Sequence, residues 1–112
     1  MTLGHTAYAE PKSSLQIKVD ETISEAQKGN ADAQAFLGVM YFIGPEMGET
    51  GIEKDLGKAA TWFEKSAEQG NSKAQAYLGQ MYLKGDGVAK DEAKGKELLC
   101  AAILQDLSLI HI

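Results

Sequence analysis

Apolar residues recur along most of this chain with the spacing of amphipathic helices. The first apolar stripe falls at i, i+4, i+8 and i+11 and consists of Leu15, Val19, Ile23 and Ala26. Further apolar patterns and capping residues predict helices over residues 31–43, 56–69, 72–84 and 92–106. Residues 1–13 lack such a period and contain Gly4 and Pro11, so we expect a flexible lead there. The pattern predicts an all-α fold.

One part of the chain repeats another. Residues 29–44 (GNADAQAFLGVMYFIG) match residues 70–85 (GNSKAQAYLGQMYLKG) at an offset of 41, and residues 51–55 (GIEKD) match residues 87–91 (GVAKD) at an offset of 36. The offset falls because residues 45–50 stand where the second copy has only Asp86. Repetition at a period of about 20–50 residues is typical of solenoids. We therefore predict an α/α superhelix of antiparallel helix pairs, with residues 45–50 as a loop.

Short joints connect the predicted helices. Each Gly-Asn step, at Gly29 and at Gly70, combines a helix C-cap with the N-cap of the next helix. A joint of this length makes successive helices antiparallel neighbours. Asp55 and Asp91 stand at the N-caps of the second helix in each pair.

A glycine recurs inside the first helix of each pair, at Gly38 and Gly79. Glycine at such a position costs about 1 kcal/mol relative to alanine. Its recurrence predicts close helix approach, with Trp62, or its counterpart Leu98, lying against the bare backbone.

The repeated motifs resemble the Sel-1-like repeats, which are relatives of tetratricopeptide repeats. The paired AQ–LG–MY–G residues, the G-V/I-x-K-D linker and the AEQGN joint carry this resemblance over residues 27–105. It implies a scaffold or adaptor for protein complexes, with the first helix of each pair lining a concave face. Within a repeat domain at residues 14–106, we expect a capping helix at 14–29, one repeat at 30–69 and another at 70–106.

The end of the chain leaves the repeat register. Residues 107–112 (LSLIHI) stand where another glycine-joined helix should begin. Two interpretations stay open: an apolar extension of the last helix, or a segment foreign to the native protein. In either case this end exposes apolar surface where a solenoid needs a polar cap. This predicts self-association through the C-terminal helix, or a missing C-terminal unit.

Composition narrows the classes of partner. A length of 112 residues indicates one small domain, and a net charge of −5 argues against nucleic acid. No apolar run approaches the roughly 18 residues that span a bilayer, so we expect no membrane partner. The single cysteine, Cys100, excludes an internal disulfide and lies in an apolar run, which predicts a buried structural thiol. Ala7-Tyr8-Ala9 has the form of a signal-peptidase site without the preceding regions, so the compartment stays open between cytoplasm and a periplasm-like space.

Catalytic chemistry finds little support. His5 and His111 lie near opposite ends with no cysteine or carboxylate cluster beside them. Residues 51–59 depart from a phosphate loop, because five residues separate the glycines and Ala59 stands at the hydroxyl position. Glu64 and Glu68 are more simply a solvated helix face than a catalytic pair. We expect no enzyme, no cofactor and no metal.

The positions at which the two copies differ are candidates for recognition. Four of the differing pairs follow one stripe of the first helices: Asp32/Lys73, Phe36/Tyr77, Val39/Gln80 and Ile43/Lys84. The predicted partner-binding residues are Asp32, Phe36, Val39, Lys73, Tyr77, Gln80 and Lys84. The competing interpretation is that Phe36, Val39 and Ile43 pack on a neighbouring helix. We therefore predict a non-enzymatic scaffold or adaptor module that binds a peptide or protein segment in the concave groove. The alternative is an inhibitor or immunity-type protein that blocks a partner enzyme through residues 45–50.

Overall fold

The described part of the chain is helical. A computed structural model describes residues 14–47 and 51–110, and no strand occurs within those ranges. Its elements are α2 (Ser14–Gln27), α3 (Ala31–Ile43), the 3₁₀ helix η1 (Gly44–Met47), α4 (Leu56–Glu68), α5 (Ser72–Lys84) and α6 (Glu92–Ile110). The all-α prediction is confirmed, and α3 and α5 have the predicted bounds. The predicted lead at residues 1–13 lies outside the described residues.

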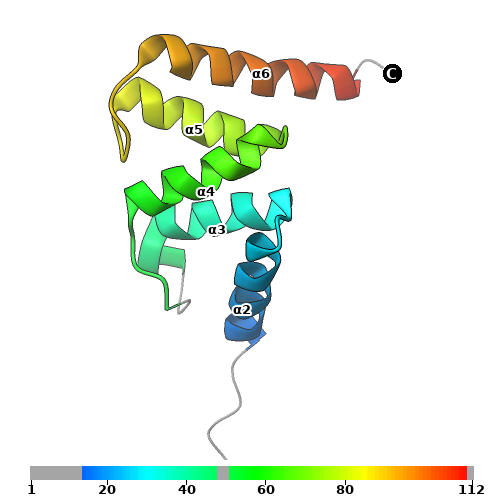
Figure 1. Ribbon diagram of the computed structural model, residues 1–112, viewed down its shortest axis with the longest axis vertical. Coiled ribbons are helices and arrows are strands. Elements are labelled where there is room, and N and C mark those ends of the chain that lie inside the picture. The colour runs from blue at the N-terminus through cyan, green and yellow to red at the C-terminus, as the bar shows by residue number, and fades with distance from the viewer. Residues whose placement is uncertain (1–13, 48–50, 111–112) are drawn as a thin grey trace, which may run out of the picture.

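The helices stack in chain order (Figure 1). Helices α3 and α4 pack as one antiparallel pair and α5 and α6 as the next, while α4 and α5 join the two pairs. Helix α2 packs against α3 and crosses the end of the stack at a steep angle (Figure 1). The predicted α/α solenoid of stacked helix pairs is therefore confirmed.

Two apolar clusters hold the stack together. One lies where α2, α3 and the loop before α4 meet, and its buried members are Val19, Ala26, Leu37, Met40 and Ile52. The other joins the two helix pairs, and its buried members are Ala35, Ala59, Ala60, Phe63, Ala74, Leu78 and Met81. Many of these side chains are alanines, which let the helices approach closely. Because the second cluster draws on both pairs, the pairs are stabilised together.

The Gly-Asn joints adopt the predicted capping geometry. Gly29 and Gly70 have φ angles of 104° and 91°, a region that residues with a Cβ atom avoid. The Asn30 side chain accepts a hydrogen bond from the Ala33 amide at 3.0 Å, and the corresponding bond to Asn71 measures 2.9 Å. Each joint thus ends one helix and begins the next within two residues.

A glutamine relay crosses each joint. Gln34 is 5% exposed; its Nε2 donates to the Ala26 carbonyl of α2 at 3.1 Å, and its Oε1 accepts from Gln69 Nε2 at 2.9 Å. The next repeat has the same arrangement, because Gln75 Oε1 accepts from Gln105 at 2.8 Å and Gln75 Nε2 lies 3.5 Å from the Ala67 carbonyl. A buried amide needs such partners, since an unpaired one costs about 1–3 kcal/mol. Each relay therefore ties three successive helices.

The glycines inside α3 and α5 mark close helix contacts. A Cβ atom at Gly38 would lie 2.6 Å from two ring carbons of Phe63, and one at Gly79 would lie 2.9 Å from the Gly95 carbonyl and from Leu99 Cγ. The predicted close approach is confirmed, but its predicted neighbours were wrong. Helix rotation turns Phe63 and Leu99 toward the glycines, one residue beyond Trp62 and Leu98.

Trp62 faces a different environment. It is half-buried against the cluster beneath α2 and α3, and the Lys65 ammonium lies 4.8 Å from the centre of its ring. A large aromatic ring in this position covers the apolar cluster while it keeps one edge in water. Its role is to close the core around α2.

The two repeats also share a contact between lysine and tyrosine. Lys58 lies over the Tyr41 ring at 5.6 Å, and Lys94 lies over the Tyr82 ring at 4.8 Å. The Tyr82 hydroxyl additionally donates to a Glu64 carboxylate oxygen at 2.9 Å, which links α5 to α4. The hydrogen bond to the Tyr82 hydroxyl raises the pKa of Lys94 above its ordinary value.

Helix α6 differs from the prediction at two points. The joint glycine is replaced by Asp106, and the helix continues to Ile110, beyond its predicted end at residue 106; both interpretations of residues 107–112 stay predictions, and His111 and Ile112 lie outside the described residues. Cys100 is exposed, so the predicted buried thiol was wrong. The apolar run around it wraps the whole helix, and only one side of α6, which includes the buried Ala102, faces α5.

The insertion between α3 and α4 is partly ordered into a helix. We predicted a loop over residues 45–50, but η1 includes residues 45–47 as a 3₁₀ turn. Pro45 favours this turn because its ring fixes φ near −65°. Residues 48–50 lie outside the described residues.

The close packing at Gly38 gives a stability test. Gly38→Ala should lower the free energy of unfolding by about 1–3 kcal/mol, because the added methyl overlaps the buried Phe63 ring and overpacking outweighs the gain in helix propensity. Urea unfolding measures this change. Gly57→Ala is the matched control, because only the Asp55 carboxylate comes near its Cβ, at 3.4 Å, and it should be neutral or stabilising. Equal stability of the two variants would contradict the proposed contact.

Candidate partner-binding groove

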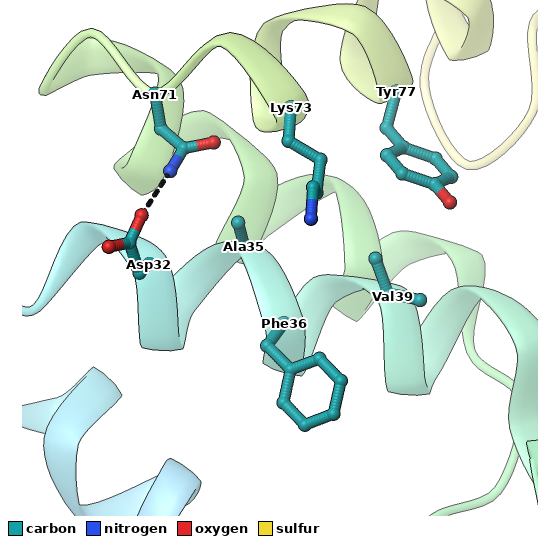
Figure 2. Close-up of a pocket in the computed structure, with 7 residues that line it drawn as sticks. All are labelled: Asp32, Ala35, Phe36, Val39, Asn71, Lys73 and Tyr77. Carbon is teal, nitrogen blue, oxygen red and sulfur yellow. Dashed lines mark hydrogen bonds between the residues drawn. The ribbon is translucent and has the colours of Figure 1, made fainter.

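A groove lies between the first helices of the two repeats (Figure 2). Its volume is about 480 Å³, and we call it the α3–α5 groove. The lining residues are Asp32, Ala35, Phe36 and Val39 from α3, and Asn71, Lys73 and Tyr77 from the second joint and α5. Five predicted recognition residues therefore lie around one cavity, in positions set by the helical period of α3 and α5. Gln80 and Lys84 do not line it, although both are exposed on α5.

The α3 wall combines one exposed ring with smaller apolar groups. Phe36 is 44% exposed, although phenylalanine is among the residues most often buried. Val39 is half-buried and packs against the central cluster, so the competing packing interpretation applies to it in part. Ile43 is also half-buried and does not line the groove. Phe36 is thus the main apolar contact surface of this wall.

Tyr77 belongs to both the groove and the core. Its ring stacks on Phe63 with a centroid distance of 5.0 Å and an angle of 4° between planes, and it meets the edge of Phe42 at 5.5 Å. Such aromatic pairs contribute about 0.5–1.5 kcal/mol beyond the area they bury. Replacing Tyr77 would therefore disturb the fold together with the groove, which the sequence pattern did not reveal.

Asn71 and Ala35 are groove residues that the sequence analysis missed. Asn71 Oδ1 caps α5, while its Nδ2 donates to Asp32 Oδ1 at 2.9 Å and holds that carboxylate at the rim (Figure 2). The sequence match between Asn71 and Asn30 predicted only the capping role of Asn71. It could not predict the hydrogen bond to Asp32, because that bond crosses from one repeat to the next. Ala35 contributes the floor, where its small side chain leaves space for a ligand atom.

The groove carries one fixed charge of each sign. The Asp32 carboxylate is held by Asn71, whereas Lys73 is exposed and makes no ion pair or side-chain hydrogen bond with the described residues. Opposite charges at separate positions on an otherwise apolar surface can orient a bound segment. The arrangement suits binding, since no nucleophile lies beside a general base here.

Other classes of site lack support in the described ranges. Among residues 14–47 and 51–110, no group of three histidine, cysteine or acidic side chains could hold a metal ion. Within the same ranges, none of the helices combines the length and the apolar character required to cross a membrane.

Comparison with known proteins identifies the repeats. The Sel1 repeat family matches at residues 31–71 and again at residues 72–107. No protein with a curated description matches the chain significantly.

Two solved structures are similar to this chain. One is c5321, a protective antigen of uropathogenic Escherichia coli strains with an SLR fold: TM-score 0.73, 31% identity, and coverage of 88% of this chain and 20% of that one. The other is a Sel1 repeat protein from Oxalobacter formigenes: TM-score 0.67, 39% identity, and coverage of 75% and 59%. This chain thus spans about a fifth of the first protein and about three fifths of the second. The two family matches cover most of its length, and the chain belongs to the Sel1 repeat family.

Proposed function

We propose that this protein is a non-enzymatic adaptor that binds a peptide or protein segment in the α3–α5 groove. Sel1 repeats are generally protein–protein interaction modules and are typically non-catalytic. One observation carries the proposal: five of the eight residues in the four predicted recognition pairs line one cavity, with the exposed Phe36 ring at its edge. Residues that the fold does not require to be alike are free to recognise a partner. Exposed aromatic side chains of this kind are frequent anchors in interfaces.

The groove proposal is tested with a variant that leaves the core intact. A peptide selected from a random library on the native protein should bind Phe36→Ala at least about tenfold more weakly, because the exposed ring is the main apolar anchor. Isothermal titration calorimetry measures the affinity. Gln80→Ala, on the same face of α5 but outside the cavity, should bind normally. Equal affinity of Phe36→Ala and native protein would contradict the groove.

The inhibitor alternative has a separate variant. Replacing residues 45–50 with one aspartate gives the first repeat the linker length of the second, where Asp86 stands between two glycines. We expect this variant to bind the selected peptide with the affinity of the native protein, since η1 does not line the α3–α5 groove. Loss of binding in this variant, with Phe36→Ala unaffected, would favour recognition through residues 45–50.

A second interaction is proposed for the outer face of α6. Ile103 and Leu104 are 57% and 64% exposed there, next to the exposed Cys100. The corresponding positions of α4 are Glu64, Ala67 and Glu68. In α4 this face packs toward α5, since Ala67 contacts the central cluster and Glu64 accepts from Tyr82. We propose that a second copy covers the equivalent face of α6.

Sedimentation velocity tests this association. The native protein should show a dimer at high micromolar concentration, and Leu104→Glu should remain a monomer because it places a charge in the apolar contact. Ile17→Glu changes an exposed residue of α2 instead and should leave the dimer unchanged. A native protein that is monomeric throughout would contradict the α6 contact.

A further inference from the structure

A second hollow continues the groove on the other side of Phe36. It lies between α2 and α3 and has a volume of about 540 Å³; we call it the α2–α3 trough. Its lining residues are Lys18, Glu21, Thr22 and Glu25 from α2, and Asn30, Asp32, Ala33 and Phe36 from the first joint and α3. Asp32 and Phe36 line both hollows. In Figure 2 the Phe36 ring points away from α5, so it stands between the two hollows.

Helix α2 turns one polar face toward the trough. Its four lining residues follow the spacing i, i+3, i+4 and i+7, which places them on one side of the helix. The buried Val19 and Ala26 lie on a different side and fix the rotation of α2 against α3. The Thr22 hydroxyl already donates a hydrogen bond to the Lys18 carbonyl, at 2.8 Å. The charged side chains are therefore the groups left to meet a ligand.

Negative charge dominates this trough. Three carboxylates line it against the single ammonium of Lys18. The Glu25 carboxylate lies 3.6 Å from Lys28, but both side chains are at least half exposed, so water screens this pair. Glu21 makes no ion pair or side-chain hydrogen bond with the described residues. A hollow with an excess of one sign of charge attracts the opposite charge.

The two hollows therefore offer different chemistry on either side of one ring. The α3–α5 groove has an apolar floor of Ala35 and Val39, with Lys73 as its single cation. The α2–α3 trough is instead lined by the carboxylates of Glu21, Glu25 and Asp32. A segment that crosses Phe36 would meet an apolar pocket and then an acidic one.

We propose that the partner segment carries a bulky apolar side chain beside a lysine or arginine. The apolar side chain occupies the α3–α5 groove, and the basic side chain enters the α2–α3 trough toward Glu21, Glu25 and Asp32. This inference rests on the proposed function. It adds the charge of the partner segment and its orientation, which runs from the α3–α5 groove across Phe36 into the α2–α3 trough. An acidic segment is disfavoured, because Lys73 would attract it at one position while three carboxylates repel it at the other.

Peptide pools of fixed composition test this charge preference. Three fluorescein-labelled pools share a central phenylalanine or leucine and differ in their flanks, which are lysine and arginine, aspartate and glutamate, or serine and glutamine. Fluorescence anisotropy should show the basic pool binding about tenfold more tightly than the acidic pool at low salt. This preference should shrink as salt rises, because exposed charges are screened.

Charge-neutral variants locate the preference. The double variant Glu21→Gln, Glu25→Gln should bind the basic pool about fivefold more weakly and the neutral pool with unchanged affinity. Glu53→Gln with Glu97→Gln removes two exposed carboxylates that line neither hollow, and it should have no effect beyond the small change in net charge.

The outcomes separate the two proposals. Binding of all pools with equal affinity and a continued dependence on Phe36 would overturn the charge preference and leave the groove standing. Tighter binding of the acidic pool, lost in Lys73→Gln, would also overturn it. If no pool binds, or if Phe36→Ala binds the pools with the affinity of the native protein, the groove proposal fails as well.

Discussion

The arrangement of this molecule depends on two buried glutamines that bridge successive helices. Gln34 and Gln75 each lie in the first turn of a helix, where the oxygen accepts from a residue in or at the end of the following helix and the nitrogen faces a carbonyl of the preceding one. A buried amide needs both partners, so sliding or rotation of one of these helices against the next would leave polar groups unpaired. Apolar contacts between alanines are less selective, since small side chains permit several registers. The relay supplies the register.

A fixed register determines what the binding surface can be. Because α3 and α5 are held at a set separation, five of the eight residues in the four predicted recognition pairs lie around one cavity. Tyr77 shows how closely the surface and core are linked, since its ring stacks on Phe63 while it lines the groove. Phe63 in turn fills the space left by Gly38. The groove is therefore an outcome of the same packing that holds the repeats together, and it is expected to change little on binding.

Local signals in the sequence predicted the helices well, whereas contacts between helices were harder to predict. The bounds of α3 and α5 follow from Asn30 and Asn71, which act within one turn of their own helix. The neighbours of Gly38 were assigned one residue away, because the repeat pattern does not fix how far α4 is rotated. Cys100 was placed in the core because its run is apolar throughout, and the pattern could not tell which side of α6 meets α5.

The glutamine relay fixes successive helices against one another, and a double-mutant cycle on Gln34 and Gln69 measures this coupling between α3 and the end of α4. Free energies of unfolding would be measured for Gln34→Ala, Gln69→Ala and the double variant, with Gln34→Ala combined with the exposed Gln80→Ala as the reference pair. The account predicts a coupling energy of about 1 kcal/mol for the relay pair and additivity for the reference pair. Additive effects in the relay pair would contradict a role of this bond in setting the register of α4 against α3.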